Sequence, residues 1–154
     1  MMGYFPAASR PMAEPSTNQP KSSTDIPSEL GGLRMTKQRK EVYGVLLEVR
    51  DHPSAQDVFL RAKEKMPSIS LATVYNCLEA LVNHGLVNQV NFDRSPTRYC
   101  PNLARHSHFQ DESTGIIHDI FFKDGVKLED FLDLPQGVDI RAVELTLKGE
   151  MPSS

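Results

Sequence analysis

Cysteine is scarce in this chain of 154 residues, which has only Cys77 and Cys100. The two do not form a C-x-x-C pair, so they supply no zinc knuckle. Long apolar runs are also missing, which excludes a membrane span, and no segment has the charged-then-apolar pattern of a secretion signal. We therefore expect a cytoplasmic protein without disulfides and without a membrane partner.

Strong net charge is absent as well, since the whole chain carries −3 at neutral pH. The charge is unevenly distributed, however: residues 34–84 contain eight Lys/Arg and six Asp/Glu, whereas residues 100–154 contain five and ten. Only the first of these segments suits a polyanion such as DNA. Its densest basic cluster consists of Arg34, Lys37, Arg39 and Lys40. A solvated helix end and a phosphate or minor-groove contact both explain that cluster.

The length accommodates one domain or two small ones. Residues 1–30 are rich in Pro, Ser, Ala and Thr without periodicity, and we interpret them as a disordered arm. We assign residues 31–100 to a DNA-binding domain, 101–104 to a hinge, and 105–154 to a second domain.

Residues 70–84 have the pattern of an amphipathic helix. Ser70 is a favourable N-cap, and Gly85 stands where a left-handed residue closes a helix. Large apolar residues recur on one face: Leu71, Val74, Leu78, Leu81 and Val82. Small or amide side chains lie away from it: Ala72, Thr73, Asn76, Cys77 and Ala80. Such side chains permit close approach to DNA, so this helix is interpreted either as the one that contacts DNA bases or as a helix buried on all sides. The pattern does not determine whether the side chain of Tyr75 points inward or outward.

Two shorter helices precede this segment. Thr36 is predicted to cap the first, and Ser54 with Asp57 fits a capping box for the second. Three apolar residues line one face of the first helix: Val42, Leu46 and Val49. Strands are expected at 86–92 and 97–100. Three helices followed by a two-stranded wing outline a winged helix-turn-helix.

The second domain is predicted to be a small α/β module, which makes the whole chain α+β. Strands are expected at 106–110, 116–122 and 138–147, and a short helix at 128–134. Phe131 and Leu132 are expected to point inward from that helix. Because the module has few core residues of its own, we expect it to pair with a second copy.

A metal-binding pattern lies at the start of this module. His106 and His108 are two apart on a predicted strand, so both side chains leave the same face. Asp119 lies on the next strand and is within reach, whereas His118 points to the other face. Two imidazoles and a carboxylate suit Fe²⁺, Mn²⁺ or Zn²⁺, although an H-x-H motif also arises by chance.

Four segments match a known pattern: R-M-T-K-Q-R at 34–39, H-P-S-A-Q-D-V at 52–58, L-A-T-V-Y-N at 71–76 and H-S-H at 106–108. In these residues and in their order the chain resembles the ferric uptake regulator family. The resemblance implies a dimeric winged-helix repressor with a C-terminal dimerisation module and a regulatory metal between the two parts.

Carried over to this chain, the resemblance implies one divalent ion per subunit, Fe²⁺, Mn²⁺ or Zn²⁺, that clamps the hinge. Its ligands would be His52, Asp93, His106, His108 and Asp119. The implied contacts to double-stranded operator DNA are Arg34, Ser70, Thr73, Tyr75 and Asn76. Arg34 would enter the minor groove and Tyr75 would contact bases. Asn76 stands where many members carry Arg, so the preferred sequence is expected to differ.

The chain also departs from the family. Asp111 and Thr114 replace the first C-x-x-C pair and the second is absent, so we expect no structural zinc. Arg105 and Ser107 replace ligands of a second regulatory site. The missing cysteines and the pair Cys100-Pro101 resemble the haem-sensing iron-response-regulator branch, although a structural role for Cys100 is the simpler interpretation. Asp93 resembles the peroxide-sensing branch.

We therefore predict a metal-responsive transcription regulator, a repressor, that acts in metal-ion homeostasis. Haem- or peroxide-responsive regulation on the same fold is the alternative. An enzyme with a catalytic iron is a third hypothesis. His52 and Asp93 would, however, occupy the coordination positions on the metal that catalysis needs open.

Overall fold

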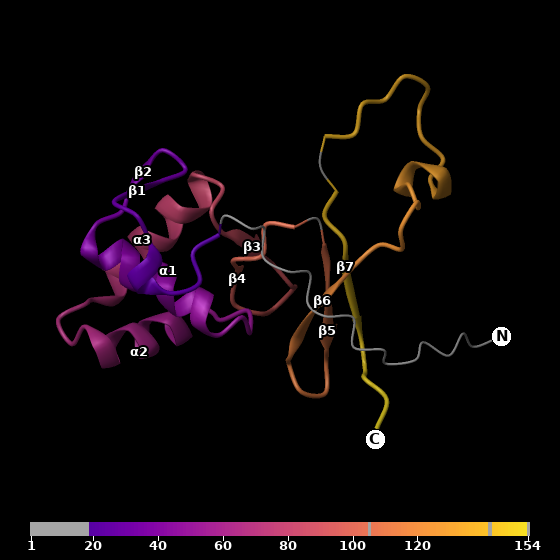
Figure 1. Ribbon diagram of the computed structural model, residues 1–154. Helices are drawn as coiled ribbons and strands as arrows, with labels where there is room; N and C mark the ends of the chain where they lie inside the picture. The colour runs from indigo at the N-terminus through magenta and orange to yellow at the C-terminus, as the bar shows by residue number, and fades with distance from the viewer. Residues whose placement is uncertain (1–18, 105, 142, 154) are drawn as a thin grey trace. The chain divides into compact units, whose positions relative to one another are not determined.

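The computed structural model describes residues 19–104, 106–141 and 143–153. These residues form two compact units, which are shown in Figure 1. The first unit comprises the chain up to Gln89 together with Arg98–Ala104. The second unit comprises Val90–Thr97 together with the chain from residue 105 onward. None of the helices in this described part is long and apolar enough to cross a membrane.

Three helices build the first unit: α1 (Lys37–Glu48), α2 (Ala55–Lys65) and α3 (Leu71–Asn83). All three predicted N-caps are confirmed. The side chains of Thr36, Ser54 and Ser70 accept hydrogen bonds from backbone N–H groups three residues ahead. These bonds satisfy donors that a helix start otherwise leaves open, which explains why each helix begins where the sequence indicates.

The core of the first unit lies between these helices. Residues of α3 that face it follow helical spacing: Val74, Cys77, Leu78 and Leu81. The placement of Cys77 away from the apolar face is therefore wrong, because it lies three residues after Val74 and four before Leu81. Val49 is also misplaced, since it is the C-cap residue of α1 and its side chain is half-exposed.

Residues 19–30, which were predicted to belong to the disordered arm, contain secondary structure. This segment contains the 3-10 turn η1 (Ser23–Asp25) and the strand β1 (Glu29–Leu30), which pairs with β2 (Leu33–Arg34). Ile26 is buried in the core. Burial of the apolar side chain of Ile26 attaches this segment to the core, which the composition of the segment did not indicate. The rest of the predicted arm, residues 1–18, lies outside the described residues.

Gly44 shows how closely this segment packs on α1. A Cβ atom added to Gly44 would lie 2.5 Å from the Cβ of Ser23, which is closer than side chains tolerate. A larger residue at this position would therefore displace η1 from the helix.

The wing is shorter than the sequence predicts. Strand β3 (Asn88–Val90) pairs with β4 (Arg98–Cys100), and a turn containing Asp93 joins them. Gly85, between α3 and the wing, has φ +69, as expected for the residue that closes the helix.

The second unit is a three-stranded sheet in the order β6-β5-β7. Strand β5 (Ser107–Asp111) runs antiparallel to β6 (Ile117–Ile120) and parallel to β7 (Thr146–Gly149). A single 3-10 turn, η2 (Leu128–Phe131), replaces the predicted helix, and the third strand begins eight residues later than predicted (146 against 138). The prediction that Phe131 and Leu132 point inward is wrong for a single chain, since Phe131 is 72% exposed and Leu132 is 46% exposed.

Candidate functional site

Two histidines and an aspartate converge within the second unit. His106 immediately precedes β5, His108 lies in it, and the antiparallel register places Asp119 of β6 opposite His108. The Nε2 atoms of both imidazoles lie 3.4 Å from Oδ1 of Asp119. The same two Nε2 atoms are 3.1 Å apart. The structure thus brings together these three sequence-predicted residues, which we call the His-His-Asp cluster.

The chemistry of this cluster fits a divalent metal ion. The three side chains are mostly withdrawn from solvent, and three ligand-type atoms point to one place. Imidazole nitrogen with carboxylate oxygen is a donor set used by Fe²⁺, Mn²⁺ and Zn²⁺. The cluster can also exist as a hydrogen-bonded histidine–carboxylate group, so its function as a ligand set stays a prediction.

His118 is adjacent to Asp119 but belongs to the other face of the sheet. It pairs in register with Phe109, and the two rings have centroids 6.2 Å apart. A strand alternates its side chains between faces, so His118 and Asp119 point in opposite directions. The side chain of His118 therefore points away from the His-His-Asp cluster.

His52 lies in the first unit, in the loop between α1 and α2, and it is buried. Its φ of +55 is in the left-handed region, which costs about 1–2 kcal/mol for a residue with a Cβ atom. The next residue is Pro53, which disfavours helical conformations at the preceding position. Neighbouring contacts must therefore maintain the backbone of His52 in this conformation.

Cys100, at the end of β4, is a potential ligand that is absent from the predicted set. It is buried in the same unit as His52, and its Sγ lies within 4.8 Å of a ring nitrogen of His52. Asp93, the predicted ligand, is exposed in the turn of the wing. One signal was available in the sequence: Cys100 is a ligand-type residue at the end of the wing, six positions before the H-x-H motif (106 − 100).

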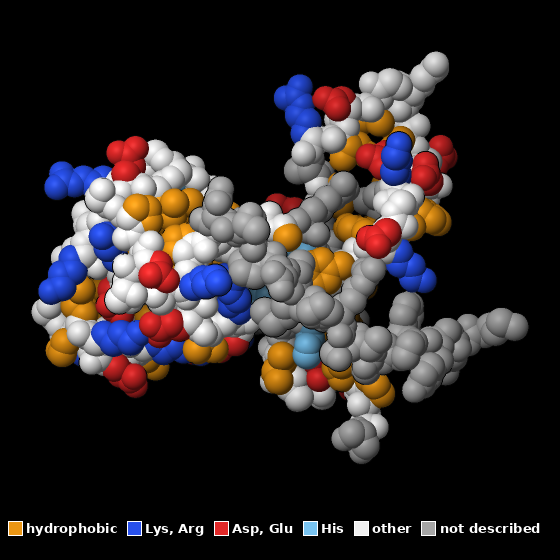
Figure 2. Space-filling view, viewed as in Figure 1, with side chains coloured by type: hydrophobic (Ala, Val, Ile, Leu, Met, Phe, Trp, Pro, Cys, Tyr) orange, Lys and Arg blue, Asp and Glu red, His pale blue; other side chains and the backbone are white. Residues whose placement is uncertain are grey.

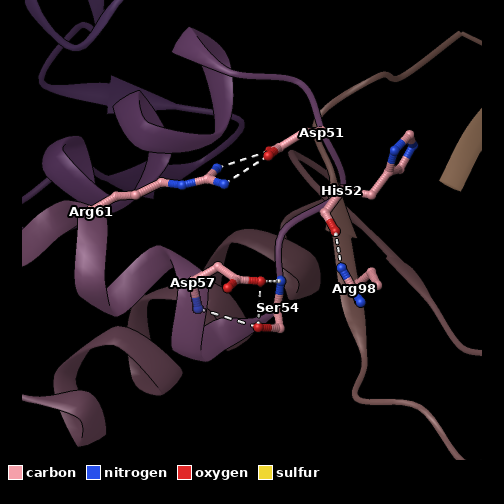
Figure 3. A network of polar contacts seen from close by, with 6 residues as sticks. All are labelled: Asp51, His52, Ser54, Asp57, Arg61 and Arg98. Carbon is pink, nitrogen blue, oxygen red and sulfur yellow. Dashed lines mark hydrogen bonds and ion pairs between the residues drawn. The ribbon is translucent and has the colours of Figure 1, made fainter. Parts of the chain in front are cut away.

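Polar contacts fasten the His52 loop on two sides, as Figure 3 shows. The guanidinium of Arg61 donates hydrogen bonds of 2.8 and 2.7 Å to the two carboxylate oxygens of Asp51. Arg98 donates from Nη1 to the backbone carbonyl of His52 at 3.3 Å. The hydrogen bonds from Arg61 lower the pKa of Asp51, and that carboxylate in turn raises the pKa of Arg61.

The loop ends in the capping box of α2. Oδ2 of Asp57 accepts hydrogen bonds from the backbone N–H of Ser54 at 3.0 Å and from its hydroxyl at 2.7 Å. These bonds to Ser54, with smaller contributions from nearby arginines, lower the pKa of Asp57. Because the ionised carboxylate is the better acceptor, ionisation of Asp57 and folding support each other.

We expect a pH-dependent contribution to stability from Asp57. Its pKa is lower in the folded protein than in the unfolded chain, so its contribution is complete above the unfolded-state pKa. The contribution is then lost as the pH falls through the lowered folded-state pKa. Urea unfolding of wild type and Asp57→Asn at neutral and acidic pH measures this. The stability difference between the two proteins should shrink on acidification, and a constant difference would contradict the assignment.

The predicted DNA-reading side of α3 faces solvent. Tyr75 is 51% exposed, and Ser70 and Asn76 are also exposed, while Thr73 is partly exposed. The hydroxyl of Ser70 serves the N-cap, since it accepts a hydrogen bond from the Thr73 N–H at 3.1 Å. The alternative of a helix buried on all sides is therefore wrong, and Tyr75 points outward as the resemblance implied.

Basic side chains lie on the same unit. Arg34 is exposed in β2, and Arg39 donates a hydrogen bond to its carbonyl at 2.8 Å. Figure 2 shows Lys and Arg side chains distributed over the visible face of the helical unit among Asp and Glu side chains. On this face the positive charge is therefore dispersed rather than gathered into a uniformly basic surface.

Comparisons with known proteins identify the family. The model of the ferric uptake regulator family matches residues 31–148. A ferric uptake regulation protein of Brucella abortus is 32% identical over 126 residues, which cover 80% of this chain and 89% of that protein. The peroxide-responsive repressor PerR of Staphylococcus epidermidis is 32% identical over 91 residues, which cover 59% of this chain and 61% of that protein.

The solved structures agree with these sequence matches. The ferric uptake regulator of Pseudomonas aeruginosa with manganese aligns with a TM-score of 0.66 at 25% identity, over 80% of this chain and 93% of that chain. The predicted fold class is confirmed: a winged-helix DNA-binding domain precedes an α/β dimerisation domain. The two cysteines of this chain, Cys77 and Cys100, form no C-x-x-C pair. Because the family match spans most of its length, the chain belongs to the ferric uptake regulator family, as a metal-responsive transcription regulator and not an enzyme.

Proposed function

We propose that this protein represses transcription as a homodimer on operator DNA and that one divalent metal ion per subunit controls its affinity. The observation that carries the proposal is the His-His-Asp cluster, with two imidazole nitrogens 3.4 Å from one carboxylate oxygen. We assign the remaining ligands to the first unit, where the side chains of His52 and Cys100 lie within 4.8 Å of each other. The ion would then join the DNA-binding domain to the dimerisation domain.

The number of ligands supports a shared ion. Zn²⁺ takes about four protein ligands in a closed site, so neither the His52–Cys100 pair nor the His-His-Asp cluster is complete alone. An ion bound by both restricts the motion of residues 101–104. It thereby favours one arrangement of the two DNA-contacting helices, α3 of each subunit, over other arrangements. A ligand shifts a conformational equilibrium in this way.

Two residues are candidates for the ligand that accompanies His52: Cys100, which belongs to the same unit, and Asp93, which belongs to the second unit. A thiolate from Cys100 would favour Zn²⁺ or Fe²⁺ over Mn²⁺, because manganese prefers oxygen ligands. Cobalt substitution separates the two candidates, since a thiolate bound to Co²⁺ gives a charge-transfer band in the near ultraviolet. We expect Cys100→Ser to lose this band, whereas Cys77→Ser and Asp93→Asn keep it. A band that survives in Cys100→Ser excludes Cys100 as a ligand.

Dimerisation is proposed through the second unit. Proteins of this family bind operator DNA and dimerise. In the single chain, large apolar side chains of this unit are exposed: Ile116, Val126, Phe131, Leu132, Val138 and Leu147. A second copy would bury them, which explains why Phe131 and Leu132 do not point into their own domain.

DNA binding in the presence and absence of metal tests the proposal as a whole. The full chain is titrated onto DNA from its own promoter region with Fe²⁺, Mn²⁺ or Zn²⁺, and then with a chelator. We expect tighter binding with at least one metal, and weaker binding of Tyr75→Ala, because base-contacting side chains contribute about 1–3 kcal/mol each. Leu60→Ala, an exposed change on α2, is the control. Affinity that is unchanged by all three metals would refute metal control.

A peroxide-responsive variant of this function is the second candidate, and the similarity to PerR favours it. Exposure of the iron-loaded protein to peroxide should then release DNA, and the zinc-loaded protein should not respond. The haem-responsive variant predicts a Soret shift that depends on Cys100. Haem titration of wild type and Cys100→Ala tests it, and an unshifted band excludes haem.

A further inference from the structure

We infer that Arg61 and Arg98 are positioning residues that hold His52 ready to bind metal and connect it to helix α2 and to the wing. The inference rests on the proposed function, in which His52 is a metal ligand. Neither arginine would touch the ion: each acts on the backbone or the neighbour of the ligand-bearing residue.

The first step is the backbone of His52. With φ +55 before a proline, this residue adopts a conformation that its own sequence does not favour. Such conformations persist only where the surroundings over-determine them, and they cluster at ligand-binding sites. The contacts around His52 therefore determine where its imidazole lies.

The second step is the attachment to α2. Arg61 binds both oxygens of Asp51, the residue before His52, and this two-point contact fixes orientation as well as distance. Ser54, two residues after His52, is fastened by the capping box of the same helix. His52 is thus held between two attachments to one rigid helix.

The third step is the attachment to β4. Arg98 donates to the carbonyl of His52, and the N–H of Tyr99 donates to the carbonyl of Pro53 at 3.0 Å. Figure 3 shows the carbonyl of His52 directed toward Arg98 while its ring points away. The next residue of this strand is Cys100. A movement of His52 on metal binding is therefore transmitted directly to a strand of the wing.

The chain offers a matched control for the Arg61–Asp51 pair. Lys65, also in α2, donates two hydrogen bonds of 2.6 and 2.7 Å to Glu48 of α1. The side chains are similarly exposed, at 45% and 39% against 36% and 44% for Arg61 and Asp51. The Lys65–Glu48 pair links two helices without touching the His52 loop, so it reports the effect of losing a surface ion pair alone.

The experiment compares zinc affinities of the full-length protein, measured by competition with a chromophoric chelator. We expect Arg61→Gln and Asp51→Asn to weaken Zn²⁺ binding roughly 10-fold, the lower end of the range for groups that orient a ligand. Lys65→Gln and Glu48→Gln should stay within about twofold of wild type, because that pair holds no ligand. Arg61→Lys should recover part of the affinity, since it keeps the charge without the planar fork.

Amide hydrogen exchange of the metal-free protein gives a second readout. The Tyr99 N–H should exchange faster in Arg61→Gln than in Lys65→Gln at equal thermal stability, because only the former loosens the loop that accepts its hydrogen bond. His52→Ala separates a failure of the positioning inference from a failure of the proposed function. If His52→Ala weakens zinc binding and Arg61→Gln does not, the positioning inference alone is overturned. If His52→Ala has no effect, His52 is not a ligand, and both the inference and its basis fail.

Discussion

Replacement of both His106 and His108 by alanine is expected to abolish the metal dependence of operator binding. Their two Nε2 atoms supply most of the donor atoms of the His-His-Asp cluster, so the variant should not bind the regulatory ion. In wild type the coupling between metal and DNA should amount to about 5- to 150-fold in DNA affinity. Fluorescence anisotropy on labelled operator DNA, with saturating metal and with chelator, measures this ratio, which should fall to about one in the variant.

His118→Ala is the matched control for this experiment. It removes an imidazole from the same sheet, one residue from Asp119, but from the opposite face. Its metal response should equal that of wild type. A double variant that still binds DNA more tightly with metal would show that the regulatory ion lies elsewhere.

Leu78→Ala is expected to lower the free energy of unfolding by roughly 2–5 kcal/mol, the usual cost of truncating a buried leucine. Leu78 is 0% exposed and lies on the core face of α3 with Val74 and Leu81. The truncation removes packing beneath the helix that carries Tyr75, so a loss of operator affinity should accompany the loss of stability. Urea unfolding with a constant m-value gives the change in free energy.

Leu60→Ala makes the same chemical change at a site that is 56% exposed on α2. It should cost well under half as much, because little burial and no cavity are involved. Equal losses at Leu60 and Leu78 would mean that the core of the first unit is not centred on α3.

Features that depend on neighbouring residues were predicted from the sequence. Thr36, Ser54 and Ser70 were expected to cap the three helices, and all three do so. The spacing of His106 and His108 correctly placed both imidazoles beside Asp119. In each case the interaction spans a few residues or one strand pairing, so the pattern contains the geometry.

Features that depend on what covers a surface were not predicted. Cys77 was placed away from the apolar face and is buried, and Phe131 was placed inside and is exposed in the single chain. A cysteine side chain is compatible with a buried or an exposed position. A phenylalanine in a dimerisation domain is compatible with exposure in the single chain, because a second copy would bury it. Ile26 belongs to the same class, since its burial depends on the packing of η1 against α1.

By itself, the sequence determined the helix starts, the wing, the His-His-Asp cluster and the family, because each is encoded in local spacing or in short motifs. Only the tertiary structure decided that Cys100 lies beside His52 and that Arg61 and Arg98 fasten the His52 loop. Cys100 and His52 are 48 positions apart in the chain (100 − 52), and no periodicity relates them. Their proximity results from the packing of β4 against the loop between α1 and α2, which is established when the whole domain folds.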